Sequence, residues 1–348
     1  MSSDNSTRRY LLSVTALLAL LALLAVVVSS AAAATLDNVK KNGFVRCGVS
    51  QNLPGFSSAG KTGKWTGLDV DLCRSLAAAA LGSAGQVRFI PLSEKERFSA
   101  LRSGEVDILS RNTTWTLARD TALGLNFAGV NFYDGQGFMV RRDLGLKSAR
   151  ELGGATVCLT IGTTTELNLG EFFRANKLNF RALKFEDSQT AAAAYSAGKC
   201  DAYTTDKSAL ASWRATFRNP GAHMILSETI SKEPLGPVVR HGDDQWLDLV
   251  RWVLFATLEA EEHGVSSANV EAMRASTNPA IRRLLGREGG MGKKLGVDDE
   301  WAYRIIKQVG NYGESFERNV GPNTPLQLPR GLNALWTKGG LHYPMPIR

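Results

Sequence analysis

Short apolar runs rich in β-branched residues alternate along the chain with longer, alanine-rich runs whose apolar residues recur at helical spacing. This alternation is typical of α/β proteins with largely parallel sheets. Glycines close two of the helical runs, as they do at many helix ends. Over the first part of the chain the pattern predicts strands at 44–50, 87–92 and 105–110, with helices over 67–82 and 93–104 between them.

The same order of elements returns over 155–206, which indicates a second unit of similar design. The segments "LRSGEVDILSRN" and "YSAGKCDAYTTD" each contain a helix end, a glycine, an aspartate and a strand that finishes in polar residues. We therefore expect two lobes, although common αβ punctuation alone would give a similar repeat. Lobe 1 is predicted over 35–140 and 236–348, with a C-terminal extension, and lobe 2 over 141–235.

Two glycine-marked segments, 131–143 and 233–244, join the two lobes in this scheme. Paired crossings of this kind are natural hinges. The run 244–264 repeats apolar residues at helical spacing and is expected to pack back on lobe 1. A further helix is expected within 300–321, followed by a glycine- and proline-rich tail of unassigned role.

The first 34 residues have the features of a signal peptide. Arg8 and Arg9 precede an apolar run from Leu11 to Val28, and an alanine-rich exit places cleavage near Ala34. The run is also long enough for an uncleaved membrane anchor. "TRRYLL" leaves twin-arginine export open beside the general secretory route. Either route makes the protein periplasmic.

Composition narrows the function classes. The formal net charge is +8, but basic and acidic residues alternate without long runs, so no nucleic-acid-binding stripe is expected. "GREGGMGKKLG" lacks the spacing of a phosphate loop, and Lys294 occupies the place of its Ser or Thr. No cofactor is predicted, and the protein is expected to be a monomer.

Four cysteines, Cys47, Cys73, Cys158 and Cys200, stand in a chain bound for an oxidising compartment. They allow three pairings. Pairing within each lobe, Cys47 with Cys73 and Cys158 with Cys200, is the simplest, and each bond would contribute roughly 3–4 kcal/mol. Four free buried thiols are the alternative.

Polar residues at the predicted strand ends are the candidate ligand-binding groups, because open parallel sheets bind ligands outside the carboxyl ends of their strands. Arginine can bind a carboxylate with two hydrogen bonds, helix-start N–H groups add donors, and an aspartate can accept from an ammonium. This combination suits a zwitterion held in a cleft between the lobes. The candidates are Asn112, Thr114, Arg119, Gly162, Thr163, Thr164 and Asp206.

Each candidate also has a structural explanation. Arg119 can pair with Asp120 on a helix surface, and the threonines at 163–165 and Asp206 can cap helices. We expect Asp69 and Asp71 to be capping or surface residues. The histidines are expected at the surface: His223, His241, His263 and His342.

Together, five segments resemble the periplasmic amino-acid-binding proteins of ABC importers, in particular the general L-amino-acid-binding branch, from about Asp37 to Arg348. They are "GLDVDLC", "RFSALRSGEVDILSRNTTWTLARD", "GLNFAGVNFYDGQGFMV", "VCLTIGTTTELN" and "AGKCDAYTTD". The resemblance implies the type II two-lobed fold, with two hinge crossings and the ligand in the interlobe cleft. It implies a receptor that closes on an L-amino acid and delivers it to a membrane permease and ATPase.

The resemblance also assigns roles. Arg119, five residues after Thr114, matches the arginine that clamps the ligand carboxylate. Thr164 matches the carboxylate donor of the second lobe, and Asp206 matches the acid that binds the α-ammonium. Asn112 stands where a small polar residue lines the cleft.

One position departs from the binders of cationic amino acids. Leu53 occupies the place of a stacking aromatic, which favours a broad range of L-amino acids over narrow cationic specificity. Glu94 is expected to border the side-chain pocket. The alternative is a secreted enzyme similar to cyclohexadienyl dehydratase, with Glu166 as its candidate general acid.

Overall fold

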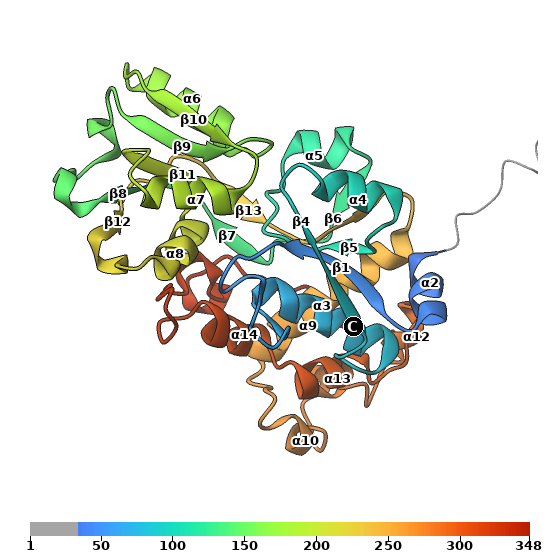
Figure 1. Ribbon diagram of the computed structural model, residues 1–348. Helices are drawn as coiled ribbons and strands as arrows, with labels where there is room; N and C mark the ends of the chain where they lie inside the picture. Colours follow the sequence, from blue (N-terminus) through green and yellow to red (C-terminus); the bar gives the residue numbers. More distant parts are fainter. Residues whose placement is uncertain (1–33) are drawn as a thin grey trace, which may run out of the picture.

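The computed structural model describes residues 34–348, which form two α/β lobes joined by a narrow two-stranded ribbon (Figure 1). The expected signal peptide lies outside these residues apart from Ala34. Along the described chain, no helix is both long and apolar enough to cross a bilayer.

The first lobe is built on a five-stranded sheet in the order β4-β1-β5-β14-β6. Its first three strands are parallel, and β14 is antiparallel to both of its neighbours. The sheet is mixed rather than largely parallel because β14 enters it on the return from the second lobe. The strands are β1 (Val45–Ser50), β4 (Val87–Leu92), β5 (Ile108–Leu109), β6 (Leu125–Phe127) and β14 (Val238–Arg240).

Helices from both ends of the chain cover this sheet (Figure 1). The predicted long return helix is α9 (Asp244–Glu262), which packs against α3 and α13. The other helices of lobe 1 before the second crossing are α2 (Thr35–Asn42), α3 (Leu68–Leu81), α4 (Arg97–Ser103) and α5 (Leu117–Ala122). A short hairpin, β2 (Ser58–Ala59) and β3 (Trp65–Thr66), precedes α3.

The second lobe repeats the plan with the order β10-β9-β11-β8-β12. Its core includes Phe138, Leu159 and Phe173, all almost fully buried. Its strands are β8 (Gln136–Arg141), β9 (Thr156–Thr160), β10 (Arg181–Phe185), β11 (Ala202–Asp206) and β12 (His223–Ile225). Its helices are α6 (Thr165–Ala175), α7 (Ser188–Ser196) and α8 (Lys207–Thr216).

The two crossings meet in an antiparallel ribbon of β7 (Phe132–Asp134) and β13 (Glu233–Leu235). Each crossing therefore holds two strands, one in the ribbon and one in a sheet. The expected lobe boundary at 140 is wrong, because β8 pairs with β11 and β12 in the second sheet. The ribbon places the first crossing near 132–134, where few residues bridge the lobes.

The C-terminal extension packs on lobe 1 and reaches the ribbon. The segment 300–321, expected to form one helix, forms two that Gly310 separates at φ +96°. Past them, the Asn333 amide accepts from the Tyr133 N–H at 2.7 Å and donates to its carbonyl at 3.0 Å. The extension thus binds the open edge of β7. Its helices are α10 (Val270–Met273), α11 (Pro279–Leu284), α12 (Met291–Lys294), α13 (Trp301–Gln308) and α14 (Tyr312–Asn319).

Two of the four histidines are buried, contrary to expectation. His342 is 2% exposed and packs against the rings of Tyr133 and Tyr312, and burial lowers its pKa to about 3. His223 is 8% exposed, and its Nδ1 lies 3.0 Å from the Tyr195 hydroxyl. The aromatic residues that cover these two histidines are distant in the sequence, so the spacing of residues along the chain did not predict the burial.

The expected disulfides are present: Cys47 with Cys73, and Cys158 with Cys200. The first fastens α3 to β1, and the second fastens β9 to the segment before β11. Replacing Cys158 and Cys200 together with alanine is expected to lower the free energy of unfolding by about 3–4 kcal/mol, because the bond closes a loop in the unfolded chain. Denaturant titration measures this loss. An unchanged midpoint would contradict it, and the Cys47–Cys73 pair provides a matched comparison with a shorter separation, 26 against 42 residues.

Candidate functional site

One cleft between the lobes collects most of the predicted ligand-binding residues. Lobe 1 contributes the ends of β1 and β4, the start of α4 and the turn before α5, and lobe 2 contributes the starts of α6, α7 and α8. Gly162 is the only predicted binding residue outside the lining. The cleft is lined by Ser50, Leu53, Glu94, Arg97, Arg111, Asn112, Thr114, Arg119, Thr160, Thr163, Thr164, Thr165, Ser188, Thr205, Asp206, Ala209 and Trp213.

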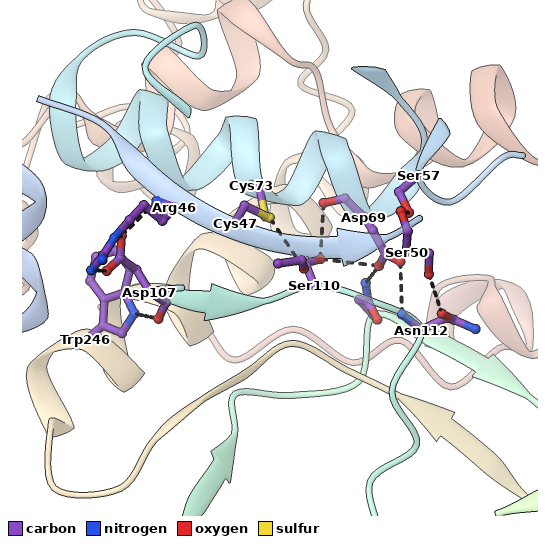
Figure 2. The surroundings of a disulfide bond; sticks show 12 residues. Arg46, Cys47, Ser50, Ser57, Asp69, Cys73, Asp107, Ser110, Asn112 and Trp246 are labelled. Atoms are coloured by element: carbon purple, nitrogen blue, oxygen red, sulfur yellow. Dashed lines mark hydrogen bonds and ion pairs between the residues drawn. A yellow bond between two sulfur atoms is a disulfide. The ribbon is translucent and has the colours of Figure 1, made fainter. Parts of the chain in front are cut away.

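The turn after β5 is held by a buried aspartate. Asp69, 2% exposed in the first turn of α3, accepts from the Asn112 N–H at 3.0 Å and from the Ser110 hydroxyl (Figure 2). Asn112 adopts a left-handed φ of +28°, and its side chain accepts from Ser50. The expectation that Asp69 caps a helix or lies at the surface is wrong, because its carboxylate fixes the turn that leads to Arg119.

Asp71 is also buried rather than exposed. Its carboxylate accepts from Ser315, Arg318 and Asn319 of α14, at 2.6–3.0 Å. It therefore fastens α3 to the C-terminal extension.

Arg119 points into the cleft rather than along the helix surface. It is 9% exposed, and its guanidinium donates to the Thr114 carbonyl at 2.9 Å and lies 5.2 Å from the Phe98 ring centre. Burial lowers its pKa from the ordinary arginine value. Within residues 34–348 it forms no ion pair with Asp120, so its charge faces the cleft.

The opposite wall is the start of α6. Gly162 turns the chain at φ +72°, and Thr164 is the N-cap residue without capping through its side chain. The Thr163 hydroxyl donates back to the Thr160 carbonyl, and the Thr164 hydroxyl donates to Glu233. The hydroxyls are thus already committed, but the first N–H groups of a helix have no intrahelical acceptor and can donate to an anion.

Asp206 stands at the N-cap position of α8, but its carboxylate makes no capping bond. It is 7% exposed, and no described side chain donates to it. Burial, followed by the neighbouring acids Asp134 and Glu233, raises its pKa well above the usual aspartate value. A cation placed in the cleft would favour the ionised form of the Asp206 carboxylate.

Two further arginines line the cleft, and neither was predicted from the sequence. Arg111 is paired with Glu94 at 2.9 Å, and both side chains are almost fully buried. Arg97 is 3% exposed, and burial lowers its pKa well below the ordinary arginine value. Its guanidinium makes two long hydrogen bonds, 3.4 Å to the Thr113 hydroxyl and 3.5 Å to the Gly162 carbonyl. Arg97 was hidden because α4 begins there, four residues later than Ser93.

Unpaired polar atoms gather at this cleft. Among the described residues, Arg97 Nε and Trp213 Nε1 are buried donors without a hydrogen-bond partner. Leu53, which occupies the place of a stacking aromatic, is 4% exposed and lines the cleft from lobe 1. Trp213 provides an aromatic side chain in the lining from lobe 2. A buried donor without a partner is costly, so the cleft favours a ligand that carries acceptors.

Glu166, the candidate acid for an enzyme, lies outside the cleft. Its side chain is 44% exposed and forms an ion pair with Lys184. Its position in the first turn of α6 is explained by the helix dipole.

Buried acids near the cleft predict how stability depends on pH. Burial raises the pKa of Asp69 and of Asp134 to about 6. The native state therefore holds more protons than the unfolded chain between about pH 4 and pH 6, and the free energy of unfolding falls as the pH rises through this window. Each of the two carboxyl groups accounts for a fall in the free energy of unfolding on the order of 3 kcal/mol.

Thermal unfolding of the ligand-free protein from pH 4 to pH 7 measures this effect. Asp134→Asn is expected to reduce the fall, whereas Asp143→Asn, at a side chain that is 78% exposed, is expected to leave it unchanged. Equal pH profiles for the wild type and Asp134→Asn would refute the assignment.

The chain is similar to known proteins over most of its length. The family model described as bacterial extracellular solute-binding proteins, family 3, matches residues 45–264. The general L-amino acid-binding periplasmic protein AapJ of Rhizobium johnstonii is 55% identical over 322 residues, covering 92% of this chain and 94% of that protein. The glutamate/glutamine/aspartate/asparagine-binding protein BztA of Rhodobacter capsulatus is 53% identical over 323 residues, covering 92% and 96%.

A solved structure is similar over nearly the same length. It is the periplasmic binding protein of an ABC transporter from Brucella ovis with glutathione bound, at a TM-score of 0.90 and 55% identity. The match covers 91% of this chain and all of that one. These relatives extend over the C-terminal region that the family model leaves out.

Proposed function

Because the chain belongs to the bacterial extracellular solute-binding proteins of family 3, we propose that it is a periplasmic receptor for L-amino acids. It captures the ligand by lobe closure and delivers it to the permease and ATPase of an ABC importer. The observation that carries the proposal is the shared cleft of Arg119 and Asp206, a fixed cation and a fixed anion on facing lobes. The relatives are receptors, so the enzyme alternative is not favoured.

The main-chain part of the ligand matches these groups. Arg119 and the N–H groups at the start of α6 suit the α-carboxylate, and Asp206 suits the α-ammonium. Each charge-assisted bond contributes roughly 1.5–3 kcal/mol. Both lobes supply partners, so the full set forms only when the cleft closes.

The side-chain end of the cleft favours acceptors. Arg111 is neutralised by Glu94, which leaves Arg97 without an anionic partner among the described residues. A zwitterion adds no net charge, whereas a ligand with a side-chain carboxylate or amide offers Arg97 and Trp213 an acceptor. BztA is named for glutamate, glutamine, aspartate and asparagine, and the Brucella ovis protein holds glutathione, a γ-glutamyl peptide. We therefore propose broad binding of L-amino acids with a preference for these side chains.

A thermal-shift screen of the twenty amino acids, followed by calorimetry, tests the proposal, because a ligand that binds only the native state raises the unfolding temperature. Glutamate, glutamine, aspartate and asparagine are expected to give the largest shifts, and lysine and arginine the smallest. No shift with any amino acid would overturn the proposed function.

Arg97→Met tests the side-chain assignment. It is expected to weaken glutamate binding by at least about tenfold more than alanine binding, since the alanine side chain has no acceptor for Arg97. Arg102→Met is the matched control, because Arg102 is exposed on the same helix.

A further inference from the structure

The C-terminal extension, residues 265–348, follows the segment that the family model matches and binds the main chain of the first crossing. Asn333 binds both main-chain polar groups of Tyr133, accepting from its N–H at 2.7 Å and donating to its carbonyl at 3.0 Å. The Tyr312 hydroxyl of α14 donates to the Asn131 carbonyl at 2.8 Å. The extension therefore holds two positions of the crossing through their backbone.

Aromatic contacts between the same two segments add to this attachment. Phe132 stacks on Phe316 of α14, with ring centres 6.1 Å apart. The ring of His342 lies 5.2 Å from that of Tyr133 and 4.5 Å from that of Tyr312. Three consecutive residues of the first crossing are thus packed against or bonded to the extension.

The other edge of the ribbon is fastened to lobe 1 as well. The Trp115 N–H donates to the Pro234 carbonyl at 2.8 Å, and the Gly236 N–H donates to the Thr113 carbonyl at 3.0 Å. Since β13 pairs with β7, the ribbon lies between two attachments to lobe 1. One is the turn after β5, and the other is the C-terminal extension.

The attachments of the first crossing change from lobe 1 to lobe 2 within one residue. The Asp134 carboxylate accepts from the Ser208 N–H at 3.2 Å, and the Gly135 carbonyl accepts from the Lys207 N–H at 2.9 Å. Both donors lie at the start of α8 in lobe 2. A bend in this crossing is therefore concentrated at the link between Tyr133 and Asp134.

We propose that Asn333 and Tyr312 are positioning residues for lobe closure, because they hold the ribbon on lobe 1 and confine the bend of the hinge to one place. This inference rests on the proposed function, since it concerns how the same cleft closes. It gives the C-terminal extension a role in binding, although the extension does not line the cleft. A hinge with fewer mobile residues loses less backbone entropy when the lobes close, which favours binding.

Distances between spin labels on the two lobes test the inference in the ligand-free protein. All four cysteines are in disulfides, so Arg102→Cys on lobe 1 and Glu171→Cys on lobe 2 place one label on each lobe at exposed positions. Asn333→Ala in this background is expected to widen the distribution of distances, because the bend then spreads over 131–133. At saturating L-glutamate the distances are expected to match those of the wild type, because the ligand fixes the closed form.

Calorimetry with L-glutamate gives a second measurement. Asn333→Ala is expected to weaken binding about tenfold, and Tyr312→Phe, which removes one hydroxyl and keeps the ring, about threefold. Tyr303→Phe is the matched control, because its hydroxyl lies in the same extension but donates to Glu271 at 2.7 Å. It is expected to keep the distances and the affinity of the wild type. Tyr312→Phe decides the test if Asn333→Ala does not fold.

Unchanged ligand-free distances in Asn333→Ala and Tyr312→Phe would overturn the inference. A widening that persists at saturating L-glutamate would also overturn it, since it would mark a loosened fold rather than a loosened hinge. A wild type that binds glutamate beside either result refutes only the role of Asn333 and Tyr312. A wild type that binds no amino acid refutes the proposed function, and the ligand-free distances then still decide whether the extension confines the hinge.

Discussion

Replacing Arg119 with alanine is expected to abolish measurable amino-acid binding while the protein stays folded. The change removes two charge-assisted hydrogen bonds to the ligand carboxylate, roughly 3–6 kcal/mol together, or about 100- to 10,000-fold in Kd. The loss is large because Arg119 is buried, where water cannot replace it. Calorimetry with L-glutamate measures the affinity.

Arg102→Ala is the matched control for this loss, since it removes an exposed arginine of the same lobe. It is expected to bind like the wild type. The ligand-free unfolding temperature of Arg119→Ala, within a few degrees of the wild type, would show that the lobe is intact. Undiminished affinity in Arg119→Ala would remove this residue from the site.

Replacing Asp206 with asparagine is the second change with a large expected effect. It keeps the shape of the side chain but removes the anion that faces the α-ammonium, so affinity is expected to fall by about 10- to 100-fold. Retained affinity would mean that the ammonium lies elsewhere.

The same variant is expected to lose the pH dependence of binding. Burial and the neighbouring acids raise the pKa of Asp206 in the empty cleft, and an ammonium favours its ionised form. Binding therefore releases a proton, and wild-type affinity falls as the pH drops below the raised pKa. Calorimetry in buffers of different ionisation heat counts the protons, and Asp206→Asn is expected to release fewer than the wild type.

The periodicity of the sequence predicted the two-lobed α/β fold and most of the cleft. Asn112 and Thr114 follow β5, Asp206 ends β11, and open parallel sheets bind ligands outside the carboxyl ends of their strands. The order of elements within each lobe therefore predicted these residues as candidates, although the two strands belong to different sheets. The within-lobe disulfides were also predictable, because each cysteine pair sits in one repeat of the pattern.

Other features depend on contacts between distant segments. Arg97 was missed because the helix was expected to begin at Ser93, which would place Arg97 inside it. The helix α4 begins at Arg97 instead, and this residue lines the cleft. The contacts of Glu233 were missed because the two threonines that donate to it, Thr114 and Thr164, belong to different lobes and meet only in the folded protein. The role of Asp69 was predicted wrongly because an aspartate near a helix start usually caps that helix. Its carboxylate instead accepts from the Asn112 N–H, in the loop after β5.

A crystal structure of the protein with L-glutamate bound tests the central claim most directly. The ligand is expected in the interlobe cleft, with its α-carboxylate on the Arg119 guanidinium and its ammonium on the Asp206 carboxylate. A ligand bound elsewhere, or one whose two charged ends contact neither residue, would contradict the account.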